Sequence, residues 1–169
     1  MSSFVFAFAL LTACEGEQPV PIACEQVEDE IAPMEGTWQI ATEMMSFDDC
    51  DMGDWVVDED HGQMEVTLTG RDEVSIVYSS GTEYCDLADD GSFTCEPRQD
   101  VDTTPADKYN LDAQILLDIV TTGSFPTESC LEMNLDIQAA CEGDDCWLVE
   151  LVTKPMPCPM GVLLEAEAL

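Results

Sequence analysis

The sequence is short of basic residues. Its 169 residues include four lysines and arginines together and one histidine, against 37 acidic residues, which gives a formal net charge of −33. Nucleic acids and anionic lipid headgroups carry charge of the same sign, so this composition excludes ordinary electrostatic binding to either. A surface this acidic fits a solvated protein in a salty medium, or loops that collect cations.

The shortage of histidine limits the catalytic chemistry. A Ser-His-Asp or Cys-His arrangement has only His61 as its base, and His61 lies in the acidic stretch 58–62 (DEDHG), which is typical of a solvated turn. The chain has no G-x-S-x-G, no glycine loop for phosphate and no H-E-x-x-H. Carboxylates are so frequent that their spacing singles out no acid–base pair. We expect a non-enzymatic protein, with a carboxylate-based hydrolase as an alternative.

Long apolar runs are also missing, apart from residues 4–11 (FVFAFALL). Eight residues are too few for a transmembrane helix but suit the apolar region of a signal peptide. Residues 11–14 (LTAC) follow at once and resemble the bacterial lipobox, in which a leucine and two small residues precede a cysteine that receives lipid. The resemblance implies a signal peptide at 1–13 and a lipid anchor on Cys14. The alternative is a buried first strand that ends in a disulfide-bonded Cys14.

Two neighbouring features bear on this prediction. No lysine or arginine precedes the apolar run, which departs from the usual signal peptide. Residues 15–16 (EG) lack the aspartate that marks retention at the inner membrane, so the resemblance implies a cell-envelope protein with an outer-membrane address. Residues 14–35 are acidic and broken by prolines, which predicts a tether that lifts a domain at 36–169 off the membrane.

Cysteine is abundant, with nine residues in a short chain, as expected in an oxidising compartment. If Cys14 carries lipid, eight remain for four disulfides. Zinc is a weaker use of them, because the spacings do not match and only one histidine is present. A hairpin loop at 89–91 would place Gly91 in the left-handed position and bring Cys85 opposite Cys95, so we predict this pair.

The other cysteines are harder to assign. Cys141 and Cys146 flank a turn-like segment at 142–145. Cys141 continues the inward set of its strand, whereas the next predicted strand points Trp147, Val149 and Leu151 inward and Cys146 outward, so their pairing stays open. Elimination alone would join Cys130 with Cys158 and Cys24 with Cys50, without geometric support.

From residue 36 onward the hydrophobic pattern has a period of two. The clearest case is 131–139 (LEMNLDIQA), in which apolar and polar residues alternate. Short turns join consecutive segments, and no helix of convincing length is visible. The pattern predicts an all-β fold, a meandering antiparallel barrel or sandwich of about eight or nine strands. The strands are expected near 37–46, 62–70, 73–80, 82–88, 92–97, 111–121, 129–140, 146–153 and 161–167.

The first predicted strand opens with Gly36-Thr37-Trp38, which resembles the G-x-W of lipocalin-like barrels. The resemblance implies that Trp38 closes the barrel floor. We expect the domain to bind a small ligand or a partner, or to have a structural role. The late arginine that usually packs over this tryptophan is missing, because no arginine follows Arg98. Trp38 as an ordinary core aromatic of another β-fold is the alternative.

Two sets of side chains are of the types that bind metal ions. In the acidic loop 48–54 (DDCDMGD), Asp49, Asp51 and Asp54 approach the alternating carboxylates of a calcium loop, which makes a calcium-dependent surface protein a second alternative. The loop does not match an EF-hand. Nine methionines could offer thioethers to copper(I), but in strands they are more typical of core packing. We expect no other cofactor.

Overall fold

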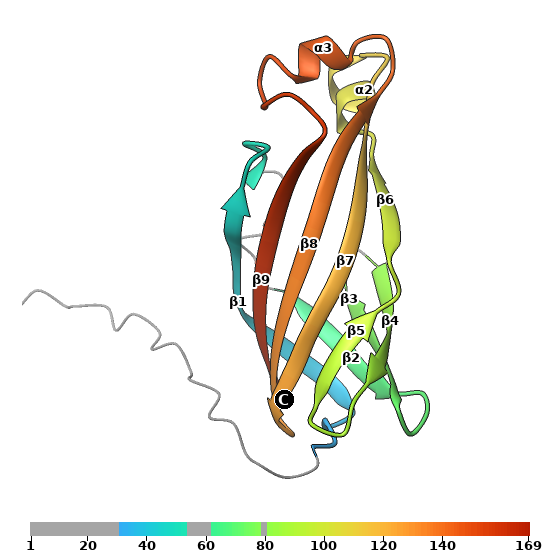
Figure 1. Ribbon diagram of the computed structural model, residues 1–169, viewed down its shortest axis with the longest axis vertical. Helices are drawn as coiled ribbons and strands as arrows, with labels where there is room; N and C mark the ends of the chain where they lie inside the picture. Colours follow the sequence, from blue (N-terminus) through green and yellow to red (C-terminus); the bar gives the residue numbers. More distant parts are fainter. Residues whose placement is uncertain (1–30, 54–61, 79–80) are drawn as a thin grey trace, which may run out of the picture.

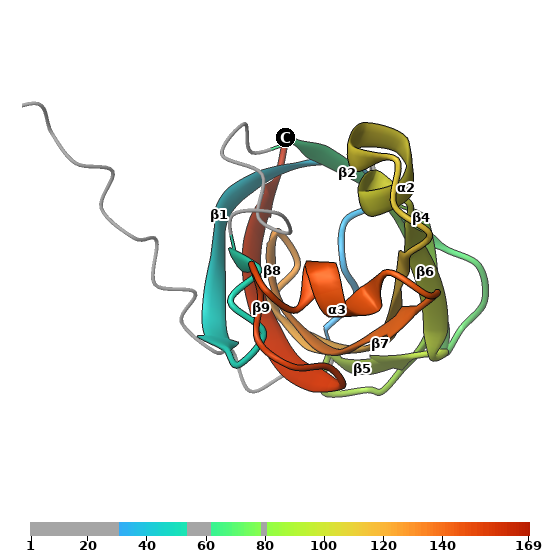
Figure 2. The same cartoon turned by 90° about the horizontal axis from the view of Figure 1, so that it is seen from above.

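The computed structural model describes residues 31–53, 62–78 and 81–169. Their nine strands form one antiparallel sheet in the order β5-β4-β3-β2-β1-β9-β8-β7-β6. An additional pairing of β5 with β7 closes eight of these strands into a barrel, and β6 remains as an extra strand beside β7 (Figures 1 and 2). The predicted all-β antiparallel fold is confirmed, and of its two forms the chain adopts the barrel.

The strands differ in length around the wall. In chain order the elements are β1 (Gly36–Asp48), β2 (Gln63–Leu68), β3 (Glu73–Tyr78), β4 (Gly81–Leu87), β5 (Ser92–Cys95), β6 (Arg98–Asp102), α2 (Thr104–Tyr109), β7 (Gln114–Thr127), β8 (Cys130–Glu142), α3 (Cys146–Val149) and β9 (Cys158–Ala168). Because β1, β7, β8 and β9 have 11 to 14 residues and β2 to β5 have four to seven, the wall is tall on one side only (Figure 1).

Alternation along the strands places apolar side chains in the interior. In β8 the apolar residues from Leu131 to Ala139 are buried, and the polar residues between them lie mostly on the outside. An eight-stranded barrel is just wide enough for side chains to fill it. The largest fully buried apolar side chains are Trp38, Phe125, Met52, Met64, Ile76, Ile115, Leu131, Met133, Met160, Val66 and Val74. Many of the methionines therefore serve as core.

The segment before β1 lies against the lower end of the barrel in Figure 1. The amide of Ile31 donates to the carbonyl of Asp89 at 3.3 Å, and that of Met34 donates to the carbonyl of Glu128 at 2.8 Å. Ile31 also packs against the core. Residues 31–35, which the sequence assigns to the tether, are thus held to the barrel.

Several predicted elements need correction. Residues 146–153 were expected to form a strand, but α3 begins at Cys146 and turns follow it, because Val149 is the only member of the expected inward set that is buried. Strand β9 begins at Cys158, three residues before the expected start of the last strand at residue 161. Strand β6 and helix α2 were not predicted. No helix in the described ranges has the length and apolar character needed to cross a bilayer.

Candidate functional site

The β4–β5 hairpin carries the disulfide that its turn predicts. Gly91 has a φ of 80°, a left-handed conformation that glycine adopts without strain. The amide of Ala88 donates to the carbonyl of Ser92 at 2.8 Å, which fixes the register. Cys85 then stands opposite Cys95, and the two form a disulfide.

Two further disulfides join other parts of the wall. Cys141 pairs with Cys146, which is possible because Cys146 begins a helix and is not bound by the phase of a strand. Cys50 pairs with Cys158, so the assignments that elimination suggested for these two cysteines are wrong. This bond ties the end of β1 to the start of β9 across 108 positions of sequence. Cys130, at the start of β8, is disulfide-bonded as well.

A polar cluster lies inside the barrel, formed by Glu83, Arg98, Tyr78 and Thr121. Glu83 of β4 is 2% exposed and is the only buried charged side chain among the described residues. Its Oε1 atom accepts from the Tyr78 hydroxyl at 2.6 Å, from Arg98 Nε at 2.7 Å and from the Thr121 hydroxyl at 3.2 Å. Buried charge is tolerated when it is paired and hydrogen-bonded in this way.

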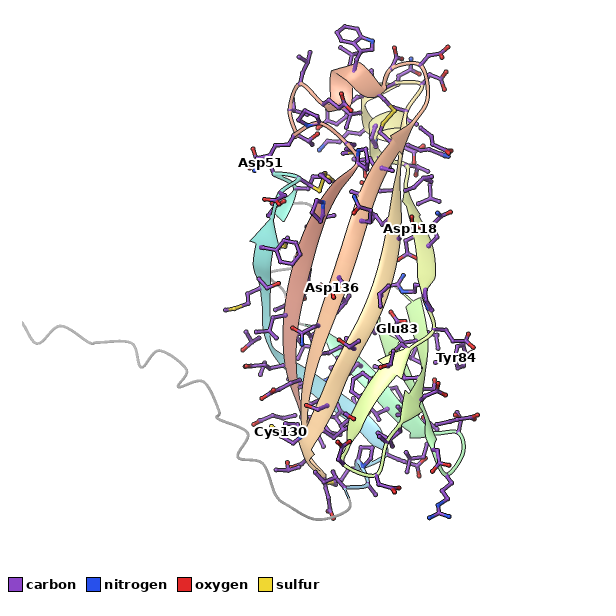
Figure 3. The ribbon with its side chains drawn as sticks, viewed as in Figure 1. Asp51, Glu83, Tyr84, Asp118, Cys130 and Asp136 are labelled. Carbon is purple, nitrogen blue, oxygen red and sulfur yellow. A yellow bond between two sulfur atoms is a disulfide. The ribbon has the colours of Figure 1, made fainter. Side chains whose placement is uncertain are left out.

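Arg98 connects the cluster to the extra strand. It stands opposite Ile119 of β7, so its side chain faces inward from β6. Its Nη2 atom donates to the Tyr78 oxygen at 3.1 Å, and its Nη1 atom binds the carboxylate of Asp100. Since β6 pairs with β7 alone, Arg98 supplies a side-chain link from β6 to the β3–β4 hairpin. Figure 3 shows Glu83 beside this part of the wall.

The environment of the polar cluster changes the pKa of Tyr78. Burial raises the pKa of its phenol well above the ordinary value, and the hydrogen bond to Glu83 acts in the same direction. The guanidinium of Arg98 opposes the shift without cancelling it. The phenol therefore remains a neutral donor. With Oε1 of Glu83 accepting three bonds and Arg98 divided between two carboxylates, the cluster joins β3, β4, β6 and β7 through side-chain hydrogen bonds.

Trp38 lies near the start of β1. It is fully buried, and its Nε1 atom donates to the carbonyl of Met34 at 3.0 Å. Its ring meets Phe125 edge-on at 5.7 Å, and Phe93 packs on Phe125 at 5.3 Å. These three aromatic side chains pack together in the core, which fits a floor residue and an ordinary core aromatic alike.

The acidic loop is organised by its own backbone. The carboxylate of Asp48 accepts from the amides of Cys50, Met52 and Gly53 at 2.7 to 2.9 Å. Asp49 and Asp51 belong to the described residues, whereas Asp54 and His61 lie outside them. In the described part of the chain no three histidine, cysteine, aspartate or glutamate side chains are grouped to hold a metal ion.

Apolar side chains are exposed at the upper end, where α3 lies across the barrel mouth (Figure 2). Trp147 is 60% exposed, Leu151 71% and Val152 67%. The strand pattern predicted that Trp147 and Leu151 face inward. This prediction is wrong, because the helix turns both side chains away from the core while Val149 remains buried. Trp147, Val149 and Leu151 also have the spacing of one face of a strand, so the sequence carries no signal for an exposed tip.

Two surface hollows are lined by described residues. The one beside β3, β4 and β5 has a volume of about 450 Å³ and includes Glu73, Tyr84, Asp86 and Glu96. The other, below α2, has a volume of about 360 Å³. Both are open depressions of the outer surface. Comparison with known proteins adds no relative: no family model, curated protein or solved structure matches the chain.

Proposed function

We propose that the chain is an exported bacterial lipoprotein, held at the cell envelope by lipid on Cys14, and that its barrel binds a partner without catalysing a reaction. The observation that carries the envelope assignment is the set of disulfides Cys50–Cys158, Cys85–Cys95 and Cys141–Cys146. Such bonds persist in oxidising compartments and are rare in a bacterial cytosol. The lipobox-like 11–14 then supplies the anchor.

The cysteine count supports the anchor separately. All seven described cysteines are disulfide-bonded, and three pairs account for six of them, which leaves Cys130. The partner of Cys130 therefore lies outside the described residues, at Cys14 or Cys24, and one of the nine cysteines is left over. We propose that the partner is Cys24, because Cys14 is the cysteine of the lipobox-like segment. Cys130 stands opposite Glu167 on the outer side of the wall, at the same end as residues 31–35, so a bond there would fasten the tether beside its entry into the barrel.

The burial and the hydrogen bonds of the described side chains favour binding without catalysis. Large apolar side chains pack the interior, and the buried carboxylate is engaged by three donors. Large apolar side chains buried among the described residues favour contact with a partner at the surface over enclosure of a small ligand. An envelope protein with so acidic a sequence is suited to presentation of a surface.

The test of the lipoprotein assignment is the intact mass of the protein from the membrane fraction, before and after reduction. We expect a chain that begins at Cys14 with lipid attached, and a gain on reduction that corresponds to four disulfides. Cys14→Ser is the matched control, and it should lose the lipid and keep the four disulfides. An unlipidated chain that begins at Met1 would overturn the proposal.

A further inference from the structure

Three apolar residues in and directly after α3 are exposed at the upper end, and we call them the α3 tip: Trp147, Leu151 and Val152. Trp147 and Leu151 are four positions apart, and the backbone continues helically, since the amide of Leu151 donates to Leu148 at 3.3 Å and that of Val152 to Val149 at 3.0 Å. Residues four apart on a helix share a face. Exposed apolar clusters of this kind mark interaction surfaces in soluble proteins.

The α3 tip is held rigidly. The Cys141–Cys146 disulfide fixes the start of α3 to the end of β8, and Val149 is buried beneath it. The amide of Asp145 donates to the carbonyl of Asp112 at 3.0 Å, and Gly143 allows the two loops to approach, because a side chain there would collide with that carbonyl. A surface ordered before binding loses little entropy when it docks.

Charge around the α3 tip narrows the choice of partner. Glu142, Asp144, Asp145 and Glu150 lie within five positions of Trp147 in the sequence. The one lysine or arginine in residues 142–154 is Lys154, whose Nζ atom donates to the carbonyl of Asp48 at 3.5 Å. An anionic bilayer would be repelled by this rim. A second copy of a chain with a net charge of −33 would be repelled as well. The complementary surface is an apolar pocket framed by lysine or arginine.

The position of the α3 tip agrees with such a role. It lies at the end of the barrel opposite residues 31–35 (Figure 1). If the chain is anchored through its N-terminal segment, the tip is presented away from the anchor. An exposed tryptophan on a rigid support is the residue type that most often dominates the free energy of a protein–protein interface.

We infer that the α3 tip inserts into an apolar, basic-rimmed pocket of a protein partner in the envelope, with Trp147 as the main anchor. The inference rests on the proposed partner-binding function and names the surface that carries it. The test begins with a photo-crosslinking amino acid at position 147 of the full chain, in its own cells. The same amino acid at Thr94 and Asn134, which are exposed on the wall, provides the comparison.

The crosslinked protein is then purified and its binding kinetics are measured against variants. We expect Trp147→Ala to weaken binding by about 30-fold or more, as for a hot-spot residue. Tyr84→Ala is the matched control, because Tyr84 is also an exposed aromatic residue, 58% exposed on β4, and this change should have no effect (Figure 3). Asp144→Asn should slow association and leave dissociation nearly unchanged, since rim charges act mainly on the encounter.

The outcomes separate this inference from the proposed function. Crosslinking from position 147 to lipid or to a second copy of the chain would overturn the inference, and so would equal binding by Trp147→Ala and the wild type. A partner captured only from Thr94 or Asn134 would overturn the α3 tip and leave partner binding in place. No captured protein from any position would overturn both, whereas the lipid anchor is judged by the intact mass alone.

Discussion

Glu83 differs from the other described carboxylates in being enclosed by the barrel, where water cannot solvate it. Three donors on one oxygen stabilise its charge, and two of them come from β6 and β7, which are brought near β4 by the β5–β7 pairing that closes the barrel. A charge satisfied only when these strands are assembled favours that one arrangement over others. Its contribution is therefore to the specificity of the fold as much as to stability.

Removal of this charge gives the first prediction. Glu83→Gln keeps the shape of the side chain but leaves Arg98 without its buried partner. We expect the free energy of unfolding to fall by about 2 kcal/mol. The loss should be smaller than for a fully enclosed ion pair, because Arg98 is partly exposed and keeps its contact with Asp100. Urea-induced unfolding measures the change. Arg71→Gln is the control, because Arg71 and Asp72 are 3.9 Å apart and highly exposed, and it should leave stability unchanged. Equal losses in the two variants would contradict the prediction.

Tyr78 gives a pH dependence. Burial and the bond to Glu83 raise the pKa of its phenol in the folded chain, while the unfolded chain keeps the ordinary value of about 10. Above that pH the unfolded state releases a proton that the folded state retains, so the free energy of unfolding falls as the pH rises. Tyr78→Phe removes this contribution. We expect its stability to decline less steeply than that of the wild type between about pH 10 and 11. Urea unfolding at each pH measures how the free energy of unfolding changes with pH for the two proteins. An equal decline in both would contradict the prediction.

At the scale of elements, the sequence specifies strands best where one face meets the core and the other meets water. Strand β8 was predicted within two residues at its C-terminal end for this reason, and the β4–β5 register followed from the requirement for glycine at Gly91. The pattern failed at α3, because Trp147, Val149 and Leu151 have the spacing of a strand. Two features of the structure distinguish the helix from the expected strand: the disulfide from Cys146 to Cys141, and the burial of Val149 without Trp147 and Leu151.

The interior cluster could not be read from the sequence for a different reason. Glu83, Arg98 and Thr121 lie on three strands, and what brings them together is the pairing of β5 and then β6 along β7. Strand β6 is five residues long and two of its residues are aspartates, so it has no apolar alternation to reveal it. Sequence patterns report faces of elements, whereas this contact depends on the order of the strands.

The disulfides allow a prediction at the same scale. A crosslink stabilises mainly by restricting the unfolded chain, and the effect grows with the length of the loop it closes. Cys50–Cys158 spans 108 positions and Cys141–Cys146 spans five. We expect removal of the first pair by Cys→Ala changes to cost about 5 kcal/mol and removal of the second about 2 kcal/mol. Denaturant unfolding of the two double variants compares them, and a larger loss at Cys141–Cys146 would contradict this account.

On the scale of the whole molecule, the wall of the barrel and its charge act together. One side of the barrel is built from long strands and the other from short ones, and the mouth on the tall side carries α2 and α3 (Figures 1 and 2). The lower end receives the N-terminal segment beside the buried Trp38. The two ends therefore have different uses in the proposed protein, one for attachment and one for contact, and the acidic wall between them stays solvated.

The net charge of −33 leads to the last prediction. Repulsion among so many carboxylates is stronger in the compact state than in the unfolded chain, so screening should favour folding. We expect the melting temperature to rise by several degrees between about 0.02 M and 0.5 M sodium chloride, as the screening length becomes short compared with the barrel. Calcium and magnesium chloride at equal ionic strength should act alike, because Asp48 is already bound by three amides. A calcium ion held only by the folded state would add its own rise, and such an excess over magnesium would instead support the calcium-dependent alternative.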